Sequence, residues 1–360
     1  MKYYIIAGEA SGDLHASNLI NSIKKLDNNS TFRGFGGDRM EEEGLELVKH
    51  YKDLSFMGFW EVLKNLFKVL NNLTFVKSDI LNFKPNVLIL VDYPGFNMRI
   101  AKFAKKRGIK VVYYITPQVW AWKKNRVLDL KQNTDLLLSI LPFEVDFFKK
   151  FNVQTNFYGH PLLDELNSLK SKSLGLEKPI IALLPGSRKQ EIKKMLPIML
   201  EVVDHFTDYQ FVIAGAPSIP NSFYRSIIND AYIPISSNKT YEVLKDSKVA
   251  VITSGTATLE AAILNIPQVV CYKTSNFSYY LARFFVKIPY ISLVNIILNK
   301  NVVKELIQFD FKKENLIFEI NKLLNKKHKQ VLLEEYMQLQ KKLGEPSASM
   351  RYAKKILSIL

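Results

Sequence analysis

The chain has 360 residues, of which 48% are hydrophobic and 23% are charged. This length and composition are typical of a globular protein with two domain cores. Lys and Arg exceed Asp and Glu by 16, which favours anionic partners such as phosphorylated ligands, acidic lipid surfaces or nucleic acid. The single cysteine, Cys271, excludes an intrachain disulfide and a cysteine-based metal cluster. Because the sequence has neither a membrane-length apolar run nor a signal-peptide pattern, we expect a cytoplasmic protein.

Short apolar strands alternate with amphipathic segments along the chain, which predicts an α/β protein with two Rossmann-like parallel-sheet domains. The expected strands lie near residues 3–7, 31–35, 86–91, 110–115, 135–140, 154–157, 180–184, 210–214, 232–235, 248–253 and 268–272. We place the first domain at 1–165 and the second at 175–343, with a helix at about 345–360 packing back on the first. Two such domains that face each other are expected to place a ligand cleft between the carboxyl ends of both sheets.

The first strand leads into an acidic turn that contains Glu9, Ser11 and Asp13. Its glycines do not match a dinucleotide-binding fingerprint, and the two carboxylates would repel a diphosphate. The turn therefore suits neutral sugar hydroxyls better, with a helix-capping turn as the alternative. His15, in the following helix, is interpreted as a packed residue rather than a catalytic one.

The segment 54–70 carries more apolar and aromatic residues than one helix face needs, with lysines between them. This pattern fits an acyl-chain or membrane contact and equally a core helix, so both interpretations stay open. The residues that carry the first interpretation are Phe56, Met57, Phe59, Trp60, Leu63 and Phe67.

Asp92 follows a hydrophobic strand and is turned outward by the Pro and Gly after it, which is where a general base is expected. A capping Asp is the alternative, although Asn97 is better placed to cap the next helix. Farther along the chain, an aromatic loop is expected to contact sugar rings or acyl chains, and basic residues after it are expected to bind an acceptor phosphate. The alternative for the aromatic residues is packing between the domains. The candidates for these contacts are Gln118, Trp120, Trp122, Arg126 and His160.

Two loops in the second half are candidates for a diphosphate site. Gly186, Ser187 and Arg188 follow one apolar strand, and an Arg side chain can form two hydrogen bonds to a phosphate. The second loop follows the strand near 248–253 and opens a helix, whose first N–H groups favour anions. Its candidate residues are Ser254, Gly255, Thr256, Thr258 and Glu260. The Glu260 carboxylate is suited to accept hydrogen bonds from ribose hydroxyls. The alternative for the whole loop is an ordinary capped turn that binds no ligand.

Eight stretches, in order, resemble the lipid-A-disaccharide synthase family, which consists of inverting glycosyltransferases of the GT-B architecture. They are residues 7–13, 57–62, 92–97, 117–122, 141–144, 158–161, 183–188 and 254–260. A later stretch departs from the family pattern, since Val294 and Lys304 replace two prolines. Asn295, Glu305 and Gln308 are retained there and are expected to contact the nucleotide.

The resemblance implies that UDP-2,3-diacylglucosamine gives its sugar to 2,3-diacylglucosamine 1-phosphate, which yields the β-1,6-linked lipid A disaccharide 1-phosphate and UDP. In this reaction Asp92 would take the proton from the 6-hydroxyl of the acceptor, while Arg188 and the 254–258 turn would hold the departing diphosphate. The sequence has no Asp-x-Asp motif, so we expect no metal and no other cofactor. The implied location is the inner face of the cytoplasmic membrane, bound peripherally to an anionic surface, with a homodimer as one option for the assembly.

Three other functions compete with this interpretation. A UDP-GlcNAc 2-epimerase has a similar scaffold but needs no acyl pocket, so the apolar segment 56–70 argues against it. A basic nucleic-acid-binding protein would explain the charge, but the lysines are scattered and no nucleic-acid motif occurs. A dehydrogenase lacks its complete dinucleotide fingerprint here.

Overall fold

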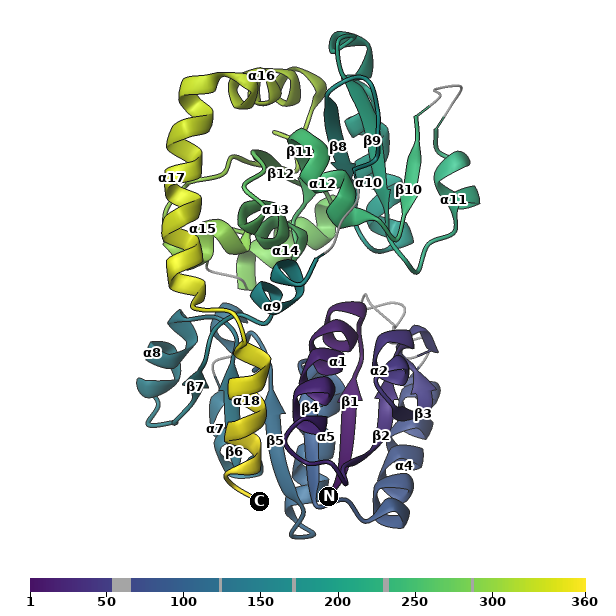
Figure 1. The fold of residues 1–360 in the computed structure, drawn as a ribbon, viewed down its shortest axis with the longest axis vertical. Helices are drawn as coiled ribbons and strands as arrows, with labels where there is room; N and C mark the ends of the chain where they lie inside the picture. The colour runs from purple at the N-terminus through teal and green to yellow at the C-terminus, as the bar shows by residue number, and fades with distance from the viewer. Residues whose placement is uncertain (54–65, 123–124, 170–172, 229–232, 286–287) are drawn as a thin grey trace. The chain divides into compact units, whose positions relative to one another are not determined.

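The computed structural model describes residues 1–53, 66–122, 125–169, 173–228, 233–285 and 288–360. They form two compact units, Met1–Asn167 with Leu343–Leu360 and Ser168–Lys342 (Figure 1). Five of the six residues predicted to contact acyl chains or the membrane, Phe56, Met57, Phe59, Trp60 and Leu63, lie outside the described residues.

The described part of the first unit contains a seven-stranded parallel sheet in the order β3-β2-β1-β4-β5-β6-β7. The strands are β1 (Lys2–Ala7), β2 (Thr31–Gly36), β3 (Leu45–His50), β4 (Val87–Val91), β5 (Lys110–Tyr114), β6 (Leu136–Ser139) and β7 (Asn156–Phe157). All five residues of β4 are buried, because a central parallel strand is covered on both faces. This burial explains the continuous apolar runs in the sequence.

Helices cover both faces of this sheet (Figure 1). Helices α1 (Ala10–Lys24) and α18 (Ala348–Leu357) pack with Tyr3 and Ile5 of β1 on one face. On the other face, α4 (Leu66–Phe83), α5 (Pro94–Lys105) and α7 (Arg126–Asn133) pack with Tyr4 and Ile6. The remaining helices are α2 (Asp38–Glu42), η1 (Tyr51–Asp53), α6 (Val119–Trp122), α8 (Phe143–Lys149) and α9 (Leu162–Asn167).

The C-terminal helix α18 is part of the first unit's core. The Asp164 carboxylate accepts hydrogen bonds from the backbone N–H groups of Ala348 and Ser349, at 3.0 and 2.7 Å, and so caps the first turn of α18. The buried Tyr352 hydroxyl donates to backbone carbonyls at Ser139 and Gly159. These contacts tie the end of the chain to β6 and to the loop after β7.

In the described part of the second unit, six parallel strands form a sheet in the order β10-β9-β8-β11-β12-β13. The strands are β8 (Ile180–Leu184), β9 (Gln210–Gly215), β10 (Ile235–Ser237), β11 (Ser247–Thr253), β12 (Gln268–Tyr272) and β13 (Glu305–Ile307). Helices α12 (Thr240–Asp246) and α13 (Ala257–Ile263) contribute to the core on one face. The other helices are α10 (Lys189–Leu200), η2 (Val203–His205), α11 (Asn221–Arg225), α14 (Asn276–Phe285), α15 (Leu293–Leu298), α16 (Lys313–Leu324) and α17 (Lys326–Leu343).

The observed strands agree with the predicted ones to within three residues at each end, except for two that the sequence did not indicate. Strand β3 forms the edge of its sheet, where polar side chains interrupt the apolar pattern. Strand β13 has only three residues, too few for a periodic signal. Among the helices of the described residues, none is both long enough and apolar enough to cross a membrane.

Candidate active site at the two switch points

Each sheet has one point where the strand order reverses. In the first unit this point lies between β1 and β4, and in the second between β8 and β11. In open α/β sheets, ligands bind beyond the carboxyl ends of the strands at such a point. The loops that follow these four strands are 8–9, 92–93, 185–188 and 254–256, and each contains residues predicted from the sequence to bind substrate.

Asp92 stands directly after β4 with a strained backbone. Its φ is 42° and that of Tyr93 is 49°, in the left-handed region that residues other than glycine rarely adopt. Such strain is characteristic of functional sites. Burial, together with the nearby Glu9 carboxylate, raises the pKa of Asp92 to about 7. A carboxyl group that titrates near neutral pH is suited to take a proton from a hydroxyl group.

The loops after β1 and β4 are packed against each other. A Cβ atom added to Gly8 would lie 2.4 Å from Cγ of Tyr93, so only glycine lets the ring lie this close to the backbone. Strand pairing aligns Ala7 with Val91, which brings Glu9 and Asp92 to the same edge of the sheet. The close packing explains why Glu9 influences the titration of Asp92.

Asp13, which is predicted to contact sugar hydroxyls, has a structural role in the first unit. Its buried carboxylate accepts hydrogen bonds from the backbone N–H groups of Gly37 and Met40, at 2.7 and 3.2 Å. It therefore caps the start of α2 from a neighbouring helix. Glu9 and Ser11 are partly exposed at the same turn and remain candidates for acceptor contacts.

His160, predicted to contact the acceptor, is buried against His15, with the ring centroids 5.9 Å apart. Its Nδ1 accepts a hydrogen bond from the backbone N–H of Leu162. Burial lowers the pKa of His15 to about 4 and that of His160 well below its usual value. His160 is therefore buried and neutral, and its contact with the acceptor stays a prediction, while the interpretation of His15 as packed is confirmed.

The aromatic loop after β5 is held by Glu144, a residue to which the sequence assigned no role. One carboxylate oxygen of Glu144 accepts from the indole N–H of Trp120 and the other from the Thr116 hydroxyl, both at 3.1 Å. Gln118 is exposed beside them and Arg126 is partly exposed, while the side chain of Trp122 is outside the described part. The only sequence signal for Glu144 was its place in the family stretch 141–144.

Replacing Glu144 by Gln tests this buried carboxyl group. Burial raises the pKa of Glu144 to about 8, so the folded chain holds a proton that the unfolded chain releases near pH 4.5. The free energy of unfolding must therefore fall as pH rises from about 4.5 to 8. We expect the Tm of Glu144→Gln to rise relative to wild type between pH 5.5 and 8.5, because the amide stays neutral. A constant Tm difference across this range would contradict a raised pKa.

The loop after β8 binds an internal anion. The backbone N–H of Ser187 donates to the Glu191 carboxylate at 3.1 Å, and Arg188 forms an ion pair with the same carboxylate at 2.8 Å. Gly186 allows this turn with a φ of 115°. The Glu191 carboxylate is thus bound by a backbone N–H group and a guanidinium group, which are also the donors that bind a diphosphate. The Arg188 side chain is 44% exposed, so it is accessible to a ligand.

The loop after β11 lies beside this one, because Ile252 pairs with Leu184 at the ends of neighbouring strands. Gly255 is exposed and Thr256 is partly exposed, as the predicted diphosphate site requires. Ser254, although partly exposed, donates its hydroxyl to a backbone carbonyl at 2.8 Å.

Thr258 and Glu260, also predicted to bind the UDP part of the donor, differ in their exposure to solvent. Thr258 is fully buried and donates its hydroxyl to the Gly255 carbonyl at 2.8 Å, so it shapes the turn, and its contact with the diphosphate stays a prediction. Glu260 is partly exposed in α13 and stays a candidate for ribose hydroxyls.

Asn295, Glu305 and Gln308 build the edge of the second sheet. The Glu305 carboxylate accepts from the side-chain amide of Asn295 at 2.9 Å and from backbone N–H groups at Ile291 and Ser292. Asn295 and Gln308 are buried with internal partners, and these contacts position the loop. The contact of these two residues with the nucleotide stays a prediction, as does that of the partly exposed Glu305.

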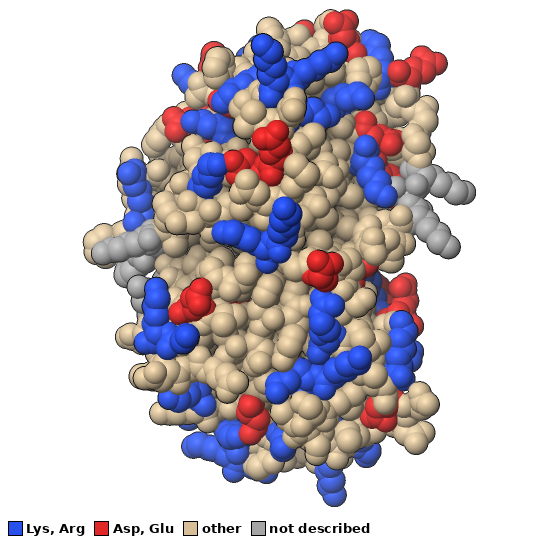
Figure 2. All heavy atoms as spheres, turned by 60° about the vertical axis from the view of Figure 1, so that its left-hand side comes forward, with Lys and Arg blue, Asp and Glu red and all other residues tan. Residues whose placement is uncertain are grey.

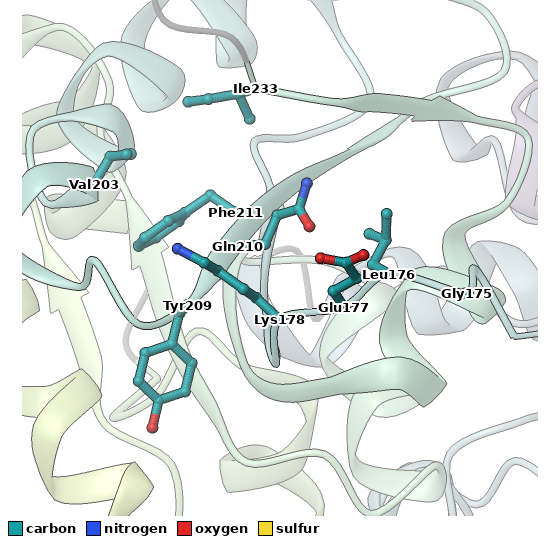
Figure 3. A pocket seen from close by; sticks show the side chains of 9 residues that line it. All are labelled: Gly175, Leu176, Glu177, Lys178, Val203, Tyr209, Gln210, Phe211 and Ile233. Atoms are coloured by element: carbon teal, nitrogen blue, oxygen red, sulfur yellow. The ribbon is translucent and has the colours of Figure 1, made fainter.

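A hollow of about 510 Å³ lies at the opposite, amino end of β8 and β9 (Figure 3). It is lined by Gly175, Leu176, Glu177, Lys178, Val203, Tyr209, Gln210, Phe211 and Ile233. Because ligands of parallel sheets bind at the carboxyl ends of the strands, we do not assign this hollow to the active site. The described residues contain no cluster of three or more His, Cys, Asp or Glu side chains arranged to hold a metal ion.

Comparisons with known proteins identify the family of the chain. A family model described as lipid-A-disaccharide synthetase matches residues 3–358. A lipid-A-disaccharide synthase of Syntrophus aciditrophicus (strain SB) is 37% identical over 371 residues, which cover 99% of this chain and 97% of that protein. The corresponding enzyme of Nitrosococcus oceani is 36% identical over 354 residues, covering 94% of this chain and 92% of that protein.

Solved structures show the same fold at much lower identity. A UDP-GlcNAc 2-epimerase of Methanocaldococcus jannaschii, in complex with UDP-GlcNAc and UDP, is similar with a TM-score of 0.69, 15% identity and full coverage of both chains. The glycotransferase of kitacinnamycin has a TM-score of 0.70 and 14% identity, covering 100% of this chain and 99% of that one. These likenesses establish the GT-B fold. Because the sequence matches span nearly the whole chain, it belongs to the lipid-A-disaccharide synthase family of glycosyltransferases.

Proposed function

We propose that the protein transfers the sugar of UDP-2,3-diacylglucosamine to the 6-hydroxyl of 2,3-diacylglucosamine 1-phosphate, forming a β-1,6-linked disaccharide 1-phosphate and UDP. The observation that supports this most is Asp92, a strained carboxyl residue with a pKa of about 7 at the switch point of its sheet. Family membership supplies the substrates and sets aside the nucleic-acid-binding alternative.

The proposed step is a single displacement with inversion. The 6-hydroxyl oxygen attacks the anomeric carbon of the donor while Asp92 takes the hydroxyl proton, and the bond from that carbon to the diphosphate oxygen breaks. Negative charge then develops on the departing UDP. Arg188 and the N–H groups of the loops after β8 and β11 stabilise this charge, as preorganised donors do in other transfer reactions.

Product identification tests the proposal. The protein is incubated with both lipid substrates, and we expect mass spectrometry to find a disaccharide 1-phosphate and one UDP for each linkage formed. In a parallel incubation, UDP-GlcNAc is the only substrate. Isomerisation of UDP-GlcNAc at carbon 2 without disaccharide formation would assign the chain to the epimerase class, whose members share its fold.

We also propose that the protein binds peripherally to an anionic membrane surface, where both lipid substrates reside. At the start of α4, Phe67 is 81% exposed and Leu70 is 45% exposed. The excess of 16 basic residues would attract anionic lipid. Figure 2 shows Lys and Arg spread over the visible face without a single patch on that face, and the exposed Phe67 and Leu70 would provide a local apolar contact.

Vesicle sedimentation measures this contact. Each large apolar side chain that enters the bilayer interface contributes up to about 1.5–3 kcal/mol. We therefore expect the double substitution of Phe67 and Leu70 by Ser to weaken binding to phosphatidylglycerol vesicles by about tenfold or more. Leu81→Ser, at the other end of α4 and 43% exposed, is the matched control and should bind as wild type does. Equal loss in both variants would show that this end of α4 is not the contact.

A further inference from the structure

Two buried side chains hold the peptide that carries Asp92. The Tyr113 hydroxyl donates to the Asp92 carbonyl at 2.7 Å, and the Asn97 side-chain amide donates to the same carbonyl at 2.9 Å. Both residues are completely buried. Burial also raises the pKa of Tyr113 well above its usual value, so its hydroxyl remains a donor throughout the working pH range.

Asn97 reaches three carbonyl groups at once. Besides Asp92, its amide nitrogen lies 3.2 Å from the carbonyl oxygen of Val91 and 3.3 Å from that of Ile6, at the ends of β4 and β1. This contradicts the expectation that Asn97 caps the next helix, because α5 already begins at Pro94 and the amide points back to the sheet. Asn97 therefore ties together the two strands that flank the switch point.

The conformation that these contacts hold is unfavourable by itself. A left-handed backbone is unfavourable for every residue that is not glycine, and Asp92 and Tyr93 adopt it in succession. The Asp92 N–H faces the carbonyls of Tyr114 and Ile115, at 3.3 and 3.2 Å, and Ile115 is itself left-handed with a φ of 65°. Without the hydrogen bonds from Tyr113 and Asn97, the backbone of this turn is expected to relax toward ordinary conformations, which have lower free energy.

We propose that Tyr113 and Asn97 are positioning residues, which hold the Asp92 peptide in its left-handed conformation and thereby fix where the Asp92 carboxyl group meets the acceptor hydroxyl. The inference rests on the proposed function, in which Asp92 is the base. A displacement of about 1 Å in a reacting group lowers turnover by about a hundredfold. Residues that keep the peptide in place therefore control kcat although they do not touch the substrate.

A matched pair of substitutions on β5 tests this inference. Tyr113 and Tyr114 are adjacent and both fully buried, but they pack on opposite faces of the sheet. Tyr113→Phe removes only the hydroxyl that holds Asp92, whereas Tyr114→Phe removes a hydroxyl on the face covered by α18. We expect Tyr113→Phe to lower kcat at least about tenfold with unchanged KM for the donor. Tyr114→Phe is expected to retain the wild-type kcat.

A double-mutant cycle shows whether Tyr113 acts through Asp92. In the Asp92→Asn background, Tyr113→Phe should cause no further loss of kcat, because the group that it positions is already absent. Asn97→Ser, measured in the same cycle, should likewise cause no further loss of kcat in the Asp92→Asn background. This variant replaces Tyr113→Phe as the test if Tyr113→Phe does not fold. Additive losses, or equal loss of kcat in Tyr113→Phe and Tyr114→Phe, would overturn the inference.

The same experiment separates this inference from the proposed function. If Asp92→Asn retains wild-type turnover, Asp92 is not the base, and the reaction proposal needs another one. If Asp92→Asn is inactive while Tyr113→Phe and Asn97→Ser both turn over as wild type does, Asp92 remains the base and only the positioning role fails.

Discussion

Asp92→Asn is expected to lower kcat by about 10²–10⁴-fold, the usual contribution of a general base, while the Kd for UDP stays unchanged. The amide has nearly the shape of the carboxyl group but cannot take the proton of the acceptor hydroxyl. Asp92 belongs to the first unit, whereas the candidate diphosphate loops belong to the second, so UDP binding should not depend on it. Calorimetry with UDP and acceptor-dependent kinetics measure the two quantities. Comparable losses of UDP affinity and turnover would contradict this division of roles.

The pH profile of the wild-type enzyme tests the same residue. A base acts only when it is deprotonated, and the pKa of Asp92 is raised to about 7 by burial and by Glu9. We therefore expect kcat/KM to fall about tenfold per pH unit below about pH 7 and to level off above it. The residual activity of Asp92→Asn should lack this acidic limb. An acidic limb that persists in the variant would assign the titration to another group.

Arg188→Ala is expected to weaken both UDP binding and turnover. A hydrogen bond to a charged group contributes about 1.5–3 kcal/mol, so the Kd for UDP should rise by about 10–150-fold. Removing a donor that stabilises charge in the transition state typically lowers kcat by a further 10²–10³-fold or so. Calorimetry gives the first value, and kcat at saturating donor gives the second.

Arg188→Lys is the control that separates the effect of the positive charge from that of the guanidinium geometry. Lysine keeps the positive charge but not the planar pair of donors, so it should recover part of the UDP affinity and less of the turnover. Full recovery of kcat in Arg188→Lys would show that charge alone suffices. A wild-type Kd for UDP in Arg188→Ala would place the diphosphate elsewhere.

The sequence predicts the sheets well because central parallel strands are buried on both faces and therefore read as continuous apolar runs, as in β4 and β11. It also predicts the two loops at the switch point of each sheet, because turns with glycine and polar residues follow those runs. Strand order explains why these loops, rather than others, form the candidate site.

The direction of individual side chains could not be predicted. Asp13, His160 and Asn295 have residue types that suit ligand binding, yet each is buried with partners inside the protein. The roles of Tyr113 and Tyr114 depend on which face of β5 each occupies, and identical neighbours give no sequence signal for this. No local sequence pattern indicates the role of Glu144, because its partners lie 24 and 28 residues away in the chain.

The most direct test of the account is whether UDP release depends on the acceptor. Purified protein is given UDP-2,3-diacylglucosamine, and UDP is followed with and without 2,3-diacylglucosamine 1-phosphate. The account predicts that UDP appears only when the acceptor is present, in proportion to disaccharide formed, because the 6-hydroxyl is the attacking group. UDP released at the same rate without the acceptor would show that water or another group attacks, and would contradict the transfer reaction.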